Sequence, residues 1–375
     1  MASKKTIMEA EEKSAVSVAF PQFVLLAELG QYAWDPGHNS NDQLKSHSDV
    51  TVADIITHLI PDAERSVDAL ETLFERLNIG KGEKRVASIS LSRIHLPITL
   101  RNNLPAQEYP NRFPNDAGYI VPLFVALQRG MILEEVDFVF GGSSLEFLAQ
   151  RKNPEGSAVY LAQRVHNVIL LTKNDSYIQN YADIGFQFER LVTGANIEDK
   201  HDLIKHENLR VMQIGSFKIL FSAEVDAIDE HGRCVEIKSG NPRYFGTKVM
   251  FQMISSGSST LVQADKRGTT VVNIQTKSIS AVIGEQSQSL RNRLQESIIR
   301  GLGELKSLSH HVLEDIPSEV EFNGAAMTLR LRSDLFALPS KHVIHELFEI
   351  AQRSSSKSGT TIKASLDEDL VIKKV

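Results

Sequence analysis

Acidic side chains gather in the middle of the chain, at spacings that suit the binding of a divalent cation. Glu224 and Asp226 stand two residues apart, Glu236 and Lys238 repeat this spacing further on, and Glu189 precedes both pairs. Charged groups within apolar segments are costly to bury unless they are paired. Because carboxylate oxygens are the ligands that hard ions such as Mg²⁺ and Mn²⁺ prefer, the pattern predicts a metal site.

An ion held in this way could hydrolyse a phosphodiester, since a metal offsets charge on the phosphoryl oxygens and lowers the pKa of an attacking water. Asp226 and Glu236 could chelate one ion between them, and Glu189 could hold a second. Lys238 could orient the water or meet the developing negative charge. An aspartate followed by a Glu-x-Lys pair is the bare pattern of many metal-dependent nucleases.

The elements that must position these groups are predicted to be a β-hairpin and a helix. Segments 217–228 and 234–238 are the predicted strands of the hairpin, and Asp229-Glu230-His231-Gly232 is its turn. Side chains two residues apart on a strand point to the same face. The two acids of the first strand should therefore share a face, and so should the Glu-x-Lys pair. Glu189 is predicted to lie in a helix over 177–193.

Taken separately, each acidic group also fits an ordinary surface position. Glu236-x-Lys238 is typical of a surface ladder with cross-strand Glu–Lys pairs, and Glu189 of a solvated helix carboxylate. The apolar neighbours indicate a core hairpin instead, and core hairpins rarely carry four charges. These neighbours are Leu220, Phe221, Val225, Val235 and Ile237.

The remaining chain alternates helix and strand patterns, which indicates an α/β (α+β type) fold. We expect a single domain over 15–375, with a mixed central β-sheet flanked by helices and an Asp…Glu-x-Lys nuclease-like core, after a disordered N-terminus at 1–14. The expected strands are 85–93, 136–140, 158–165, 167–171, 259–266, 269–276 and two short runs within 319–332, with a strand or short packed segment at 16–29. The expected helices are 49–77 (interrupted at Pro61), 119–131, 244–256, 287–308 and 340–353. The expected loops are 96–116, 141–144 and 354–361.

Composition bounds the compartment more than the function. The 375 residues carry a formal net charge of −6, which argues against a protein that coats nucleic acid by bulk charge, but not against an enzyme with a local basic groove. No apolar run approaches the roughly 20 residues of a membrane span, and the charged N-terminus lacks the apolar stretch of a signal peptide. The single cysteine, Cys234, is expected to be buried and suits a reducing, intracellular setting.

Five short motifs, in their order and spacing, resemble those of the DXO (Dom-three-Z) decapping exoribonucleases. Three of them carry the acidic groups: Gly-Phe-Gln-Phe-Glu at 185–189, Phe-Ser-Ala-Glu-Val-Asp at 221–226 and Val-Glu-Ile-Lys at 235–238. Tyr-Pro-Asn-Arg-Phe at 109–113 and Phe251-Gln252 are similar to two further motifs of that family. The resemblance covers residues 109 to 276.

The resemblance implies an RNA 5′-end quality-control hydrolase. Members of that family cut after the first nucleotide and release intact cap structures, including incomplete, NAD and other non-standard caps. Many also remove pyrophosphate from a 5′ triphosphate or degrade RNA in the 5′→3′ direction. The expected partner is a capped, NAD-capped or triphosphate RNA 5′ end, handled by a monomer in the nucleus, the cytoplasm or both. Some relatives also pair with a separate 5′→3′ exoribonuclease.

Carried over to the matching positions, the resemblance implies a site for two Mg²⁺ or Mn²⁺ ions. Glu189, Asp226 and Glu236 would be metal ligands, joined by the backbone carbonyl of Ile237. Glu224 would act in catalysis through a metal-bound water.

Two further polar residues are implied to act on the substrate. Lys238 and Gln252 would contact the reacting phosphate or its water. Basic residues near the motifs could form a track for the RNA, beginning with Arg190, although ordinary surface charge fits them equally well. The others are Arg243, Lys248, Lys266 and Arg267.

One departure from the family pattern bears on activity. The family has an arginine on the strand ahead of the helix with the first metal glutamate, whereas Phe140-Gly141-Gly142 stands at the matching place here. Arg151 or Arg164 could take its part from elsewhere. Loss of one cation contact could cost roughly a few kcal/mol of transition-state stabilisation. The alternative function is therefore a catalytically weakened or inactive RNA 5′-end-binding regulatory relative, and a third is a DNA nuclease.

Overall fold

The computed structural model describes residues 15–34 and 86–332. Within the second range, the undescribed positions are 103, 105–107, 110–121, 124, 127–130, 132–135, 156–157, 166, 175–178, 181, 198–204, 241–245 and 311–316. The predictions for the following residues lie outside the described ones: 1–14, 49–77, 340–353, 354–361, Arg243 and most of the motif at 109–113. None of the described helices has the length and hydropathy of a membrane-spanning segment.

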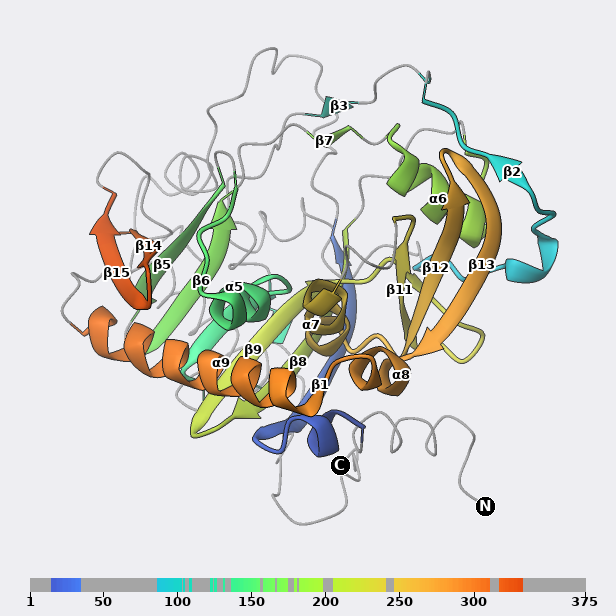
Figure 1. The fold of residues 1–375 in the computed structure, drawn as a ribbon. Helices are drawn as coiled ribbons and strands as arrows, with labels where there is room; N and C mark the ends of the chain where they lie inside the picture. Colours follow the sequence, from blue (N-terminus) through green and yellow to red (C-terminus); the bar gives the residue numbers. More distant parts are fainter. Residues whose placement is uncertain are drawn as a thin grey trace, which may run out of the picture.

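Two β-sheets organise the described part of the chain (Figure 1). The larger sheet has the strand order β1-β8-β9-β4-β6-β5-β14-β15, the smaller has the order β10-β11-β12-β13-β2, and β3 and β7 form a separate pair. The strands of the larger sheet are β1 Phe23–Trp34, β4 Phe138–Gly141, β5 Val159–Val165, β6 Val168–Asn174, β8 Lys205–Ile214, β9 Phe217–Glu224, β14 Ser318–Asn323 and β15 Ala326–Leu331. The other strands are β2 Ile98–Thr99, β3 Glu108–Tyr109, β7 Gln179–Asn180, β10 Ala227–Ile228, β11 Cys234–Lys238, β12 Thr260–Arg267 and β13 Thr270–Ser278.

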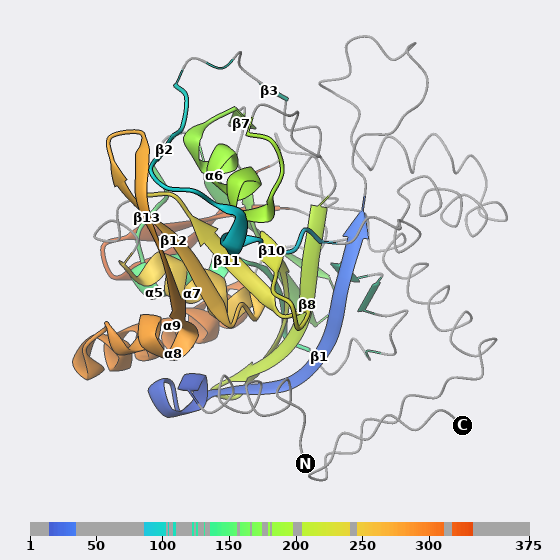
Figure 2. The same ribbon diagram turned by 90° about the vertical axis from the view of Figure 1, so that its right-hand side faces the viewer.

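Helices cover one face of the larger sheet (Figures 1 and 2). α5 packs with α7 and α9 along that face, and α8 packs beside α7, whereas α6 packs on β11 of the smaller sheet. The helix bounds are α5 Ser144–Gln150, α6 Ile184–Thr193, α7 Gly246–Ser256, α8 Ile279–Gly284 and α9 Gln288–Ser309, with a 3₁₀ turn, η2, at Leu91–Arg93. β4 runs parallel to β6 and β9, while β8 is antiparallel to β9. The predicted mixed α/β fold is confirmed, with its strands divided between two sheets.

The main core forms between the larger sheet and these helices. Ile219 and Phe221 are fully buried and meet Met250 of α7 and Leu302 of α9 in one apolar cluster. Because side chains alternate along a strand, Ser222 takes the opposite face of β9. This packing fixes β9, and with it the position at which the strand ends.

The hairpin predicted over 217–238 is only partly present. β9 pairs with β8 and β4 in the larger sheet, and only the two residues of β10 pair with β11. β8 was not predicted, and it also holds the chain beyond the end of β9, where the Val225 N–H donates to the carbonyl of His206 at 2.8 Å. The prediction that Glu224 and Asp226 share the face of one strand is therefore wrong, because the chain changes sheets between them.

The strand predicted at 85–93 is also wrong. Its described residues form a single bridge between Ser88 and Ile228, followed by η2. Ser90 N–H donates to the carbonyl of Val192 at 2.7 Å, so this segment links the end of α6 to β10 instead of entering a sheet.

Most other predicted elements are present with shifted ends. The structure confirms the strands predicted at 136–140, 158–165, 167–171, 259–266, 269–276 and within 319–332, which are β4, β5, β6, β12, β13 and the pair β14 and β15. It also confirms the helices predicted at 244–256 and 287–308, which are α7 and α9. The segment at 16–29 contains a helical turn and then β1, and residues 122–123 and 125–126 of the helix predicted at 119–131 are helical. The loop predicted at 96–116 contains the short strands β2 and β3, and Cys234 is buried as expected.

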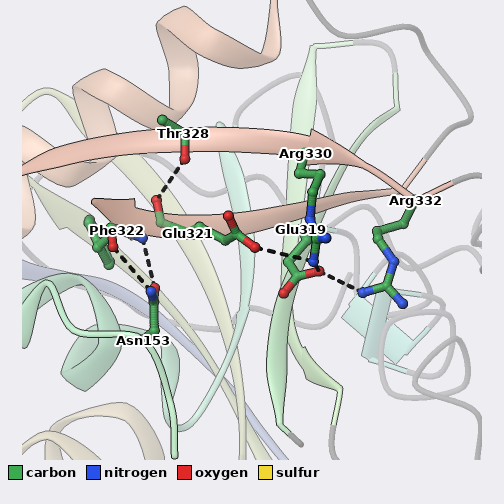
Figure 3. A network of polar contacts seen from close by, with 7 residues as sticks. All are labelled: Asn153, Glu319, Glu321, Phe322, Thr328, Arg330 and Arg332. Carbon is green, nitrogen blue, oxygen red and sulfur yellow. Dashed lines mark hydrogen bonds and ion pairs between the residues drawn. The ribbon is translucent and has the colours of Figure 1, made fainter. Parts of the chain in front are cut away.

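A polar network fastens the β14–β15 hairpin (Figure 3). The Asn153 side chain pairs with both backbone groups of Phe322: its Nδ2 donates to the carbonyl at 3.1 Å, and its Oδ1 accepts from the N–H at 2.7 Å. Glu319 accepts hydrogen bonds from Arg330 at 2.5 Å and from Arg332 at 2.6 Å. Burial alone would raise the pKa of Glu319, but the bonds from Arg332 and Arg330 outweigh burial and lower it.

Glu319→Gln should destabilise the protein at neutral pH and have little effect in acid. Because the folded-state pKa of Glu319 is lowered, its stabilising contribution is present above the ordinary value of 4.5 and is lost as the pH falls through the lowered value. We expect a loss of about 1 kcal/mol at pH 7, since the exposed Arg330 limits the strength of its pair. Urea denaturation at pH 7 and pH 3 measures this loss, and an equal loss at both pH values would contradict it.

Candidate active site

The candidate active site lies where the chain passes from one sheet to the other. β9 ends at Glu224 in the larger sheet and β10 begins at Ala227 in the smaller one, so Asp226 stands between the sheets. β11 carries Glu236 and Lys238 and pairs with β10 and β12. α6 lies against β11, as Figure 1 shows, and brings a further glutamate to this junction.

Lys238 lies between two carboxylates. Its Nζ forms an ion pair with Glu236 Oε1 and lies 3.5 Å from Asp226 Oδ2. The same Asp226 oxygen accepts a hydrogen bond from the Ile237 N–H at 2.7 Å. These contacts hold Asp226 against β11, so the structure brings the aspartate and the Glu-x-Lys pair together.

The caps of α6 set the ends of the helix that carries Glu189. The side chain of Asp183 accepts hydrogen bonds from the N–H groups of Gly185 at 2.6 Å and Phe186 at 3.2 Å, which starts the helix seven residues later than predicted. The helix ends at Gly194, whose φ of 76° is the left-handed conformation that glycine adopts readily.

Packing then turns α6 toward β11. Phe188 and Val192 are fully buried and join Val235 and Ile237 of β11 in a second apolar cluster. Glu189 follows Phe188 directly and is half-buried. The apolar face of the helix thus sets which side of α6 packs on β11.

The carboxylates alter one another's pKa values, which places them in one electrostatic cluster. Burial raises the pKa of Glu236 to about 7; the carboxylates of Asp226 and Glu224 add to this rise, and Lys238 opposes it. Burial also raises the pKa of Glu189 well above its ordinary range, and the next largest cause is the carboxylate of Asp226. The pKa of Asp226 is raised by burial and by Glu224, against the effect of Lys238 and of the β11 backbone N–H.

The chemistry of these donors suits a hard divalent cation. Burial alone would lower the pKa of Lys238, but Asp226 and Glu236 outweigh burial and raise it, so the lysine stays charged. One ammonium group balances one of the negative charges that four ionised carboxylates carry, and a dication would offset two more. Among the residues that the structure describes, no three acidic, imidazole or thiol side chains are spaced to hold an ion as they stand.

The other predicted site residues lie on neighbouring elements. Gln252 belongs to α7, which packs against β9 and β11, and its buried Oε1 has no hydrogen-bond partner within the described structure. Such an acceptor calls for a ligand or a water. Arg190 is buried on α6 and donates to the carbonyl of Ile197 at 3.3 Å. The roles of Gln252 and Arg190 toward a substrate stay predictions.

The two arginines considered as substitutes for the family arginine lie on other elements. Arg151 forms an ion pair with Glu304 of α9 at 2.7 Å, and its guanidinium lies 4.8 Å from the centre of the Phe322 ring. It therefore joins the helix layer to the β14–β15 hairpin. Arg164 lies on β5, which β6 and β4 separate from β9 in the larger sheet.

Sequence reasoning overlooked Gln187, the middle residue of the motif at 185–189. Its side chain is fully buried and forms three hydrogen bonds with backbone groups. A polar residue between two phenylalanines of one helix was the available signal.

Comparison with known proteins places the fold. No family model and no curated protein sequence matches the chain. Among solved structures it is similar to S. pombe Rai1, with a TM-score of 0.53 and 14% identity over 68% of this chain and 89% of that one. It is also similar to S. pombe Rai1 in complex with 3′-FADP, with a TM-score of 0.52 and 14% identity over 68% of this chain and 89% of that one. The chain has the Rai1/Dxo1 fold.

K. lactis Dxo1 in complex with manganese gives a similar match, with a TM-score of 0.51 and 12% identity over 71% of this chain and 88% of that one. At these identities the likeness concerns the fold. The resemblance to the DXO family that the motifs predicted is confirmed at that level, and the Rai1/Dxo1 fold gives the acidic cluster its structural setting.

Proposed function

We propose that this protein is a divalent-metal-dependent RNA 5′-end hydrolase of RNA quality control. It would remove intact cap structures, including incomplete, NAD and other non-standard caps, or pyrophosphate from 5′ ends, and could degrade RNA in the 5′→3′ direction. The observation that carries the proposal is the cluster of Glu189, Glu224, Asp226 and Glu236 around Lys238, on the Rai1/Dxo1 fold.

The ligands of two similar structures support the proposed cofactor and substrate class. The K. lactis Dxo1 structure contains manganese, and an S. pombe Rai1 structure contains 3′-FADP. Mn²⁺ suits the carboxylate donors of the present cluster. A nucleotide fits a substrate whose reacting group is a phosphate. We propose Mg²⁺ or Mn²⁺ as the cofactor, with two ions per site.

Residues from two elements and from the junction of the sheets would hold these ions. Glu189 from α6, Asp226 from the junction and Glu236 from β11 would be ligands, together with the backbone carbonyl of Ile237. When bound, the ions would offset charge on the phosphoryl oxygens and lower the pKa of the attacking water.

The neighbouring side chains would position the reactants. Lys238 keeps its proton, because the carboxylates beside it raise its pKa, and it would donate a hydrogen bond to a phosphoryl oxygen. Glu224 is exposed at the end of β9 and would accept a hydrogen bond from the attacking water. The Oε1 of Gln252, which has no partner among the described residues, would accept a hydrogen bond from the water or the substrate.

A regulatory RNA 5′-end-binding protein is the second candidate. The sequence at the end of β4 favours it, since Gly141 stands beside Ser222 of β9 where the family pattern has an arginine. Arg151 forms an ion pair with Glu304 and lies at the C-terminal end of α5, whereas Gly141 precedes its N-terminal end. Without an arginine at this place, RNA could bind to the cluster while turnover stays weak.

Cleavage assays on defined RNAs test the proposal. The purified protein is incubated with cap-labelled, NAD-capped, 5′-triphosphate and 5′-monophosphate RNA, in Mn²⁺, in Mg²⁺ and in chelator. Release of an intact cap or of pyrophosphate that chelator abolishes would support the hydrolase. Binding without release, unchanged by Glu236→Ala, would favour the regulatory protein, and cleavage of DNA alone would favour a DNA nuclease.

The cellular setting is part of the same proposal. We expect the protein to act as a monomer inside the cell, in the nucleus, the cytoplasm or both. A separate 5′→3′ exoribonuclease would then consume the monophosphorylated RNA that decapping leaves.

A further inference from the structure

The amide of Gln187 joins α6 to a distant part of the chain. Its Nε2 donates to the carbonyl of Arg101 at 2.8 Å and to the carbonyl of Ala182 at 2.7 Å. Its Oε1 accepts from the N–H of Arg101 at 2.9 Å. Both backbone groups of one residue are therefore held by one side chain, much as strands pair in a sheet.

The segment held in this way is itself anchored in the smaller sheet. Ile98–Thr99, which form β2, pair with β13 at the edge of that sheet. Leu100 follows, is 1% exposed and belongs to the apolar cluster under α6. Its N–H donates to the carbonyl of Thr269 at 3.0 Å. The contacts of Gln187 thus tie the first turns of α6 to a fixed edge of the smaller sheet.

We propose that Gln187 is a positioning residue that holds Glu189 where it can share an ion with Asp226. The inference rests on the proposed function, because it concerns the same metal site. Gln187 and Glu189 lie on one short helix, so a displacement of the first turns of α6 moves both. Because Asp226 is fixed to β11, the distance between the two acids depends on where α6 lies.

An amide at this position achieves what an apolar side chain would not. Phe188 and Val192 already anchor the helix to the core, but apolar contacts are non-directional. Hydrogen bonds are directional, so those to both the N–H and the carbonyl of Arg101 also fix the rotation of α6 and its position along its axis. A buried amide is costly unless its hydrogen bonds are made, which favours one arrangement over the alternatives.

Direct measurement of Mn²⁺ binding tests the role of Gln187. Isothermal titration calorimetry with MnCl₂ is performed on the full chain and on Gln187→Met, which keeps the side-chain length and loses all three hydrogen bonds. Gln187→Asn, which keeps the amide but shortens the side chain by one methylene group, is a second variant. Asn153→Ala is the matched control, since Asn153 pairs in the same way with both backbone groups of Phe322, at the β14–β15 end of the larger sheet (Figure 3).

We expect Gln187→Met to weaken Mn²⁺ binding by about 10-fold or more and Gln187→Asn by about threefold. Substitution of a residue that holds a metal ligand in place commonly has an effect of this kind. Asn153→Ala should lower the melting temperature but leave the Mn²⁺ affinity within about twofold of wild type. Because Glu189 itself is kept, high Mn²⁺ should restore the maximal cleavage rate of Gln187→Met.

Wild-type Mn²⁺ affinity in Gln187→Met or in Gln187→Asn would overturn the inference, whatever the melting temperature. A wild-type protein that binds Mn²⁺ but cleaves no RNA would overturn the proposed function alone, since the affinity ratio between variants would still report on Glu189.

Discussion

Glu236→Gln should abolish RNA 5′-end cleavage without weakening the fold. The substitution removes one proposed metal ligand, and we expect the cleavage rate to fall by about 1,000-fold or more. Glu236 is 3% exposed and its pKa is raised to about 7, so the metal-free fold disfavours its ionised form. The neutral amide should therefore leave the free energy of unfolding unchanged or increase it.

Single-turnover cleavage of NAD-capped RNA and urea denaturation in chelator measure the two effects. Glu155→Gln is the control, because Glu155 pairs with Lys152 on the surface, away from the cluster, and both quantities should stay at the wild-type value. Full activity in Glu236→Gln would refute its assignment as a metal ligand. A large loss of stability would show that Glu236 holds the fold instead.

Lys238→Met should destabilise the metal-free protein strongly. The substitution leaves Asp226 and Glu236 without the cation that pairs with both of them, and we expect a loss of about 3 kcal/mol at pH 8. The pKa of Lys238 is raised, so its contribution is fully present below the ordinary lysine value and covers the whole neutral range. Cleavage should fall as well, because the proposed donor to the phosphoryl oxygen is lost.

The deficit of Lys238→Met should depend on pH in a defined direction. Carboxylates with raised folded-state pKa values hold protons that the unfolded chain has released, so the stability of the variant should fall as pH rises from 6 to 8. Mn²⁺ should recover most of the loss, because an ion that binds only the folded state stabilises it. Urea midpoints at the two pH values, with and without Mn²⁺, measure this. A variant as stable as wild type in chelator at pH 8 would contradict the role of Lys238.

Short-range signals predicted the elements that local chemistry determines. Ser287 caps α9 through a hydrogen bond from the N–H of Leu290 at 3.2 Å, at the residue where the helical period begins. The β12–β13 hairpin turns at Gly268, whose φ of 63° requires the freedom of glycine. Motif order also indicated which acids would meet, and Lys238 does contact both Asp226 and Glu236.

Long-range pairing could not be predicted in the same way. Alternation of apolar and polar residues can indicate that a segment is a strand, but not which strand it pairs with or which sheet it joins. The pairing of β9 with β8 and β4, and of β11 with β12, could therefore not be inferred from it. For this reason the segment around Asp226 was predicted to be part of one continuous strand. Gln187 was overlooked for the same cause, because its partner Arg101 lies 86 residues away in sequence.

Anomalous diffraction from crystals soaked in Mn²⁺, recorded at the manganese absorption edge, tests the metal site most directly. The proposed function predicts anomalous peaks within coordination distance of the carboxylates of Glu189, Asp226 and Glu236, at the junction of the two sheets. Crystals of Glu236→Gln treated in the same way should lose at least one peak. Peaks elsewhere on the molecule, or an empty junction at saturating Mn²⁺, would contradict a metal-dependent hydrolase.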